Sequence, residues 1–223
     1  MRFLRKVLAI VQKDVAVELR TKEILSSMFI FALLVIVIFS FAFELRVEDV
    51  RQVTPGVLWV TFIFAGTLGL NRSFALEKDR GCLEGLLLCP VDRSAIYFGK
   101  VLGNVIFMLI VEAIILPIFS VLFNVSLFQP ALILIIVLGT LGYAGVGTLL
   151  SAMAAHTRAR EVMLPILLFP IMVPAMIAAV KATGGIVDGQ QLSEIAHWVR
   201  LLVVFDVIFL AISFMTFDYV VEE

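Results

Sequence analysis

The sequence predicts an all-α membrane protein of about six transmembrane helices, and three observations support this prediction. Of the 223 residues, 62% are hydrophobic and 16% are charged, whereas soluble domains contain roughly 25% charged residues. The mean hydropathy is +1.11. Apolar runs of about 20 residues, the length needed to cross the hydrocarbon core of a bilayer, recur along the chain. A water-soluble fold would lack the polar residues that its surface requires.

Residues 1–22 are predicted to form an amphipathic helix that lies in the membrane interface. Basic side chains occupy one face of this helix, at Lys6, Lys13 and Arg20. Apolar residues recur about once per helical turn on the other face, at Leu4, Val7, Leu8, Val11, Val15 and Leu19. The first long apolar run follows only after this charged stretch and is too long for a signal peptide, so we expect it to remain as a span.

Six apolar segments follow the amphipathic helix and are predicted to cross the membrane within a single domain covering residues 1–223. The longer segments either tilt or protrude from the bilayer. Their predicted limits are 24–43, 56–74, 95–123, 131–155, 162–180 and 196–220.

The distribution of basic residues predicts the orientation of the spans. Of the 17 lysines and arginines, thirteen lie before the first span or around the second and fourth loops, and Lys100 is counted among them. Only four lie on the opposite side. Cytoplasmic loops carry the excess of basic residues in membrane proteins. We therefore expect the N-terminus, the second and fourth loops and the C-terminus to be cytoplasmic.

The second loop, residues 77–93, is predicted to form a short amphipathic coupling helix that ends near Pro90. A helix lying across the ends of two spans can sit in a groove of a soluble partner and transmit its motion. The alternative is a surface helix that only packs beneath the membrane. No phosphate-binding glycine-rich loop ending in Gly-Lys-Ser/Thr is present, so any ATP must be hydrolysed by another polypeptide.

The motif content of this loop favours docking. Its order of residues resembles that of the membrane subunits of ABC-2-type exporters, at Glu77, Gly81, Leu83-Glu84, Leu87, Pro90 and Gly99-Lys100. More narrowly, the chain resembles the haem exporter protein B family of the cytochrome c maturation system. The additional matching positions are Pro55-Gly56, Trp59, Leu164-Pro165, Pro170 and Pro174.

This resemblance implies a non-catalytic permease of the bacterial inner membrane, present as a homodimer in a complex with a soluble ABC ATPase and other cytochrome c maturation membrane proteins. It implies no cofactor bound by this chain, haem as a possible substrate of the complex, and no nucleic-acid partner. Three alternatives remain: an ABC-2 exporter of lipid, polysaccharide or drug, a non-transporting scaffold that couples an ATPase to a haem-handling partner, or a proton-coupled carrier. The implied ATPase-docking residues are Glu77, Arg80, Gly81, Leu83, Glu84, Leu87 and Pro90.

Two acidic residues fall inside predicted spans, Glu112 in the third and Asp206 in the sixth. Ionised groups are costly at this depth and mark functional sites when they line a polar path or bind a partner. The alternative for each is a protonated carboxyl group hydrogen-bonded to a neighbouring helix. Both interpretations are retained.

The remaining motifs are predicted to be structural. Pro165, Pro170 and Pro174 suit either a gate or a bent helix packed on its neighbours. His197 could offer an axial nitrogen to haem iron, but beside Trp198 it fits an interfacial anchor better. No metal site is expected. Glycines of the fourth span should allow close helix approach, at Gly139, Gly142, Gly145 and Gly147.

Overall fold

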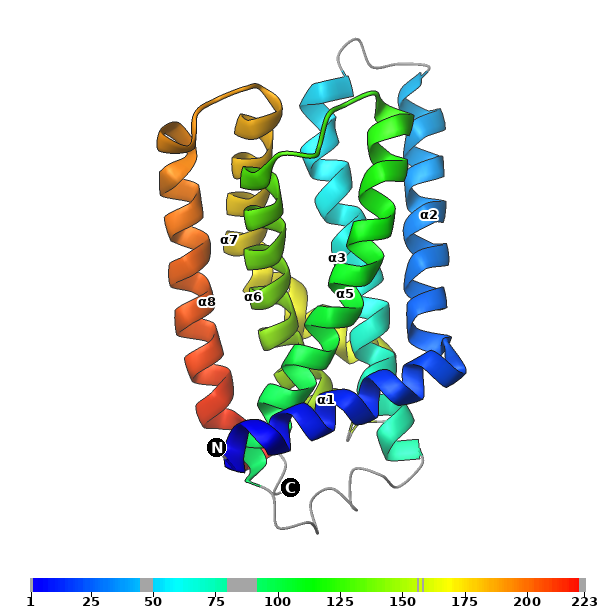
Figure 1. The fold of residues 1–223 in the computed structure, drawn as a ribbon, viewed down its shortest axis with the longest axis vertical. Coiled ribbons are helices and arrows are strands. Elements are labelled where there is room, and N and C mark those ends of the chain that lie inside the picture. Colours follow the sequence, from blue (N-terminus) through cyan, green and yellow to red (C-terminus); the bar gives the residue numbers. More distant parts are fainter. Residues whose placement is uncertain (1, 45–49, 80–91, 156, 158, 221–223) are drawn as a thin grey trace.

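The computed structural model of the chain describes residues 2–44, 50–79, 92–155, 157 and 159–220. These residues form seven α-helices, six of them in an up-and-down bundle and one that crosses the end of the bundle (Figure 1). The helices are α1 (Arg2–Thr21), α2 (Glu23–Glu44), α3 (Val50–Asp79), α5 (Arg93–Phe123), α6 (Pro130–Ala155), α7 (Arg160–Val187) and α8 (Leu192–Val220).

Six of these helices, α2 to α8, are long and apolar enough to cross a membrane, which confirms the predicted fold class. Two spans extend furthest beyond their predicted limits. The second starts before Pro55, and the fifth continues past Lys181 to Val187. Neither residue ends the helix, because a proline in the first turns of a helix loses few backbone hydrogen bonds and an exposed lysine at a span end can reach the interface.

The ends of the helices fall on two sides of the bundle. The Asp79 end of α3, the Arg93 start of α5 and the Val220 end of α8 lie at the same end as α1 (Figure 1). The junction between α6 and α7 lies there too. This arrangement places the predicted cytoplasmic loops and both chain ends on a common side, as the distribution of basic residues requires.

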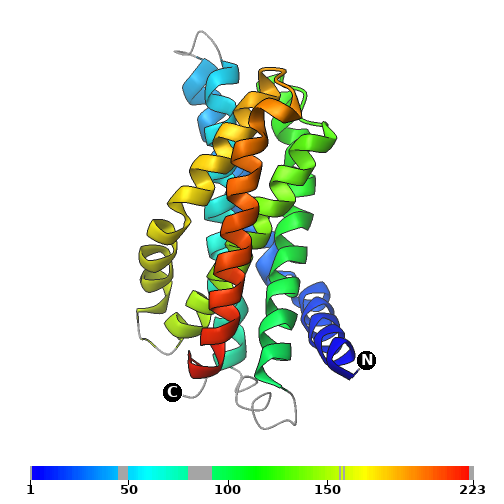
Figure 2. The same cartoon turned by 90° about the vertical axis from the view of Figure 1, so that its left-hand side faces the viewer.

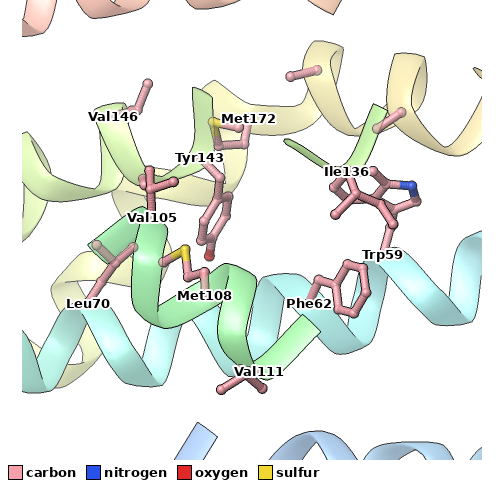
Figure 3. Packing of buried hydrophobic residues seen from close by; sticks show 14 of the residues in the cluster. Trp59, Phe62, Leu70, Val105, Met108, Val111, Ile136, Tyr143, Val146 and Met172 are labelled. Atoms are coloured by element: carbon pink, nitrogen blue, oxygen red, sulfur yellow. The ribbon is translucent and has the colours of Figure 1, made fainter. Parts of the chain in front are cut away.

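Helices α3 and α6 form the centre of the bundle. Their most apolar windows are 67% and 72% buried, whereas those of α2 and α8 are each 22% buried. Aromatic and methionine side chains fill the space between α3, α5 and α6, as seen around Trp59, Met108 and Tyr143 (Figure 3). The low burial of α2 and α8 leaves apolar faces directed outwards, as expected for helices in contact with lipid.

The glycines of α6 allow the close packing that the sequence predicts. A β-carbon placed at any of the four positions would lie 2.1–2.4 Å from a side chain of a neighbouring helix. Because such distances are shorter than van der Waals contact, any larger residue would force the neighbouring side chain of α3 or α8 to move. The four pairs are Gly139 with Trp59, Gly142 with Asp206, Gly145 with Leu210 and Gly147 with Leu70.

Helix α1 is amphipathic, as predicted, but only part of its apolar surface is buried against the bundle. Val7, Ile10 and Val11 are buried against the bundle, whereas Leu4 and Leu19 are 66% and 65% exposed. The reason is that α1 packs sideways on α5, so its apolar surface is divided between protein and membrane. Figure 2 shows α1 lying outside the bundle, beside the lower part of α5.

Candidate functional site

The most specific polar contact of α1 is a buried ion pair with α5. The Lys100 ammonium group donates a hydrogen bond to Asp14 Oδ2 over 2.9 Å. The two side chains are 2% and 11% exposed. Asp14 also pairs with Lys13 over 3.1 Å. Lys100, which the sequence pattern counted among the loop cations, is instead an internal residue that is stabilised within α5 by the carboxylate of α1.

The contact between Lys100 and Asp14 explains why a glycine precedes the lysine in the Gly99-Lys100 motif. A β-carbon at Gly99 would lie 2.8 Å from Ile10, and one at Gly103 would lie 3.6 Å from Asp14 Oδ2. Glycine therefore lets α1 approach the backbone of α5 closely enough for the adjacent lysine to reach Asp14. The motif positions α1 on the third span.

Further contacts fix both ends of α1. Near its start, Lys6 pairs with Asp92 over 3.1 Å, immediately before α5. Near its end, the buried Glu18 carboxylate accepts a hydrogen bond from the Leu25 backbone N–H over 2.8 Å. That amide lies in the first turn of α2, where helix N–H groups lack intrahelical partners. Helices α1, α2 and α5 are therefore tied together at the same side of the bundle.

The predicted ATPase-docking residues lie at the end of α3 and in the segment between α3 and α5, outside the residues whose side chains the structure describes. Glu77 belongs to the last turns of α3, but its side chain is outside the described residues. Arg80, Gly81, Leu83, Glu84, Leu87 and Pro90 are outside them as well, as are Cys82, Cys89 and His156. Their flanks are described: Arg93, at the start of α5, donates to the Asp218 carbonyl oxygen over 3.4 Å.

The two intramembrane acids occupy different environments beside α6. Glu112 is 5% exposed, and the Thr140 hydroxyl lies 2.8 and 2.9 Å from its two carboxyl oxygens. Asp206 is 4% exposed and has no hydrogen-bond partner among the described residues. Its Oδ1 atom lies against Gly142. Glu112 is thus a polar contact between α5 and α6, whereas Asp206 is an uncompensated carboxyl group between α6 and α8.

The proline and tryptophan motif positions lie away from α1, in α3 and α7. The Trp59 indole N–H donates to the Thr183 hydroxyl over 3.0 Å, and a β-carbon at Gly184 would lie 3.7 Å from Pro55, so these positions hold α3 against α7. A β-carbon at Gly56 would meet no atom within 4 Å, so Gly56 does not contribute to this contact.

Helix α7 accommodates all three of its prolines without interruption. It runs as one helix from Arg160 to Val187 through Pro165, Pro170 and Pro174, and Figure 2 shows its Arg160 end leaning away from α8. Proline removes a backbone hydrogen bond and bends a helix. The gate and packing interpretations of these prolines both remain hypotheses.

Sequence reasoning missed several polar contacts that join the central helices. Tyr143 lies 2.6 Å from the Thr67 hydroxyl and donates to the Ile63 carbonyl oxygen over 2.9 Å. The Asn104 side chain donates to the Thr148 hydroxyl over 3.0 Å. The available signal was the presence of such residues inside apolar spans, since buried polar groups in lipid need partners. Beside Glu112, Tyr143 also lines a cavity of about 10 Å³.

The histidine of the last span contacts its own helix. His197 Nδ1 lies 3.1 Å from the Glu194 carbonyl oxygen, and its ring lies against Trp198 with a centroid distance of 4.5 Å. Within the described part of the chain, no cluster of three or more His, Cys, Asp or Glu side chains could hold a metal ion. The haem-ligand and anchor interpretations of His197 stay predictions.

Comparison with known proteins agrees with the resemblance inferred from the motifs. The chain is 26% identical over 172 residues to the "Heme exporter protein B" of Rhodobacter capsulatus, covering 76% of this chain and 78% of that protein. It is 24% identical over 179 residues to the protein of the same name from Pseudomonas aeruginosa, covering 80% of each. The family described as "CcmB protein" matches residues 5–222. The chain therefore belongs to the CcmB family of membrane proteins.

Proposed function

We propose that this chain is the membrane-spanning permease subunit of an ABC transporter complex that serves haem export or haem-chaperone release during cytochrome c maturation. Its membership of the CcmB family carries the proposal, and its relatives are named "Heme exporter protein B". The chain itself is non-catalytic. A separate soluble subunit supplies ATP hydrolysis, and other cytochrome c maturation membrane proteins complete the complex.

The mechanical step depends on the segment 77–93, which receives the ATPase through Arg80, Glu84 and their neighbours. This segment leads directly into α5. The start of α5 is joined to α1 by the pair of Lys6 with Asp92 and to α8 by the bond from Arg93 to the Asp218 carbonyl. A displacement of the docked segment therefore moves α5, α1 and the adjoining end of α8 together, as a rigid body.

The protein is a multi-pass component of the bacterial inner membrane, with both termini in the cytoplasm. The excess of thirteen basic residues over four on one side supports this orientation. Two copies related by a two-fold axis form the working unit, since closed symmetric dimers are the commonest oligomers. On this arrangement, α1 and the ATPase-docking segment face the cytoplasm.

A second candidate function is a scaffold that relays ATPase motion to a haem-handling partner without transporting haem. The observation in its favour is the size of the cavity beside Glu112. At about 10 Å³ it has room for roughly one water molecule. Haem cannot occupy this cavity, which lies between the central helices.

The proposal is tested by purifying the tagged chain in mild detergent from its native membrane and identifying its partners by mass spectrometry, with a haem absorbance scan. We expect a small soluble ATPase together with cytochrome c maturation proteins. An ATPase without maturation partners or haem would indicate an exporter of another substrate. Recovery without any ATPase, under conditions that preserve other complexes of the same membrane, would contradict the ABC permease function.

A further inference from the structure

An apolar crevice opens where α1 turns into α2. Figure 1 shows α1 meeting α2 at one end and crossing the lower part of α5. The crevice has a volume of about 260 Å³, and Leu25, Phe29, Ile110, Val111 and Ile114 form its apolar walls. This is below the roughly 300–1,000 Å³ typical of pockets for drug-sized molecules. One extended apolar chain fits such a space better than a bulky ligand.

The crevice is fixed by hydrogen bonds at its polar edge. Lys22 has a positive φ of 55° between the two helices, and its backbone N–H donates to the Glu18 carbonyl oxygen over 2.7 Å. The Ser26 hydroxyl donates back to the Lys22 carbonyl oxygen. The Glu18 carboxylate is directed to the Leu25 amide. The opening between α1 and α2 is therefore a property of the folded chain.

The charged side chains at this edge indicate what kind of headgroup the crevice can bind. The Lys22 side chain lines the crevice, is exposed, and has neither an ion pair nor a hydrogen bond within the described part of the chain. Its aliphatic stem can cover the apolar wall while the ammonium group extends to the headgroup level. The exposed Glu23 follows it and can accept a headgroup amine. Glu18, which also lines the crevice and accepts the Leu25 amide hydrogen bond, keeps its negative charge, so the two carboxylates at this edge favour a headgroup that carries an amine beside its phosphate.

We infer that this crevice binds a phospholipid of the leaflet adjoining α1, with one acyl chain between α2 and α5 and the phosphate on Lys22. The crevice lies on spans that face hydrocarbon, so acyl chains are the apolar groups available to fill it. The bound lipid joins α1, α2 and α5 at the end of α1 remote from the pair of Lys6 with Asp92. It is a ligand held at a defined position rather than part of the surrounding bilayer.

The test uses the full-length chain in vesicles of phosphatidylethanolamine and phosphatidylglycerol. The probe is phosphatidylethanolamine with a diazirine in one acyl chain, and diacylglycerol carrying the same chain serves as the phosphate-free probe. After photolysis, mass spectrometry locates the label. We expect more label on residues 25–29 and 110–114 than on the outward-facing residues of α6. Even labelling of all lipid-facing helices would overturn the inference.

Two pairs of variants test the binding of the acyl chain and the binding of the lipid headgroup separately. Ile110→Trp, or Ile114→Trp if the first does not fold, fills the crevice and should abolish the enrichment for both probes. Ile133→Trp, a control at a residue of α6 that is 51% exposed, should retain it. Retention of labelling in folded Ile110→Trp or Ile114→Trp protein would contradict an acyl chain in the crevice.

Lys22→Gln should reduce labelling by the phospholipid about fivefold, the effect of one basic residue near a lipid headgroup, and leave the diacylglycerol probe unchanged. Arg20→Gln is the matched control, because this exposed cation belongs to α1 but does not line the crevice. Equal effects of Lys22→Gln and Arg20→Gln would exclude the assigned phosphate contact.

Discussion

Replacing Asp14 with asparagine should loosen α1 from α5, because it removes the carboxylate that pairs with the buried Lys100 ammonium group. Lys100 is 2% exposed and Asp14 is 11% exposed, so water can solvate neither group well. Removing one partner of a buried ion pair costs about 3–5 kcal/mol. A local opening made easier by about 3 kcal/mol becomes roughly a hundredfold more populated, since each 1.4 kcal/mol changes an equilibrium about tenfold.

The opening is measured by thiol labelling of a cysteine introduced at Ile10, a residue of α1 that is 5% exposed and lies against α5. Cys82 and Cys89 are replaced by serine in this background. Lys13→Gln is the control: it removes the more exposed pair to Asp14, which is worth about 0–1 kcal/mol. We expect Asp14→Asn to label up to about a hundredfold faster than the parent and Lys13→Gln to label similarly to it. Equal rates for the two variants would refute the argument that the buried pair holds α1.

Two further predictions concern the packing of α6. Gly139→Ala should lower the thermal unfolding midpoint, at a cost of about 1–3 kcal/mol, because its β-carbon would lie 2.2 Å from Trp59. The control Gly56→Ala, whose β-carbon would have no neighbour within 4 Å, should leave the midpoint unchanged. Equal midpoints for the two variants would contradict the close contact. Asp206→Ala should stabilise the purified protein by about 1–3 kcal/mol, because it removes a buried polar group without a partner among the described residues. A destabilised Asp206→Ala would show that this carboxyl group has a favourable contact that Gly142 does not provide.

Hydrophobic run lengths were sufficient to predict the spans, because a membrane helix must be apolar over about 20 residues whatever it packs against. Because each span is apolar all round, however, its sequence does not indicate which face is buried. Glu112 and Asp206 look alike in the sequence, but one faces a hydroxyl group and the other faces Gly142. Which neighbour each acid meets depends on helix rotation, and apolar residues around the whole circumference leave that rotation unspecified.

The α1 contact illustrates the other limit of sequence reasoning. Lys100 was counted with the basic residues around the second loop. It is buried because Asp14, 86 residues earlier in the chain, supplies its counter-charge. Periodicity within either segment could not reveal this pairing, since it depends on how α1 crosses α5. The one indication in the sequence was Gly99 of the family motif, because the absence of a side chain there allows α1 to cross α5 closely.

The most direct test of the proposed permease function is retention of the ATPase by a chain with a reversed charge in the docking segment. Glu84→Arg and the control Asp188→Arg, at an exposed residue that directly follows the end of α7, are purified in parallel from the native membrane. The amount of ATPase recovered per permease is then measured. We predict that Glu84→Arg loses the ATPase while Asp188→Arg keeps it. Full retention by a correctly folded Glu84→Arg chain would contradict docking through residues 77–93.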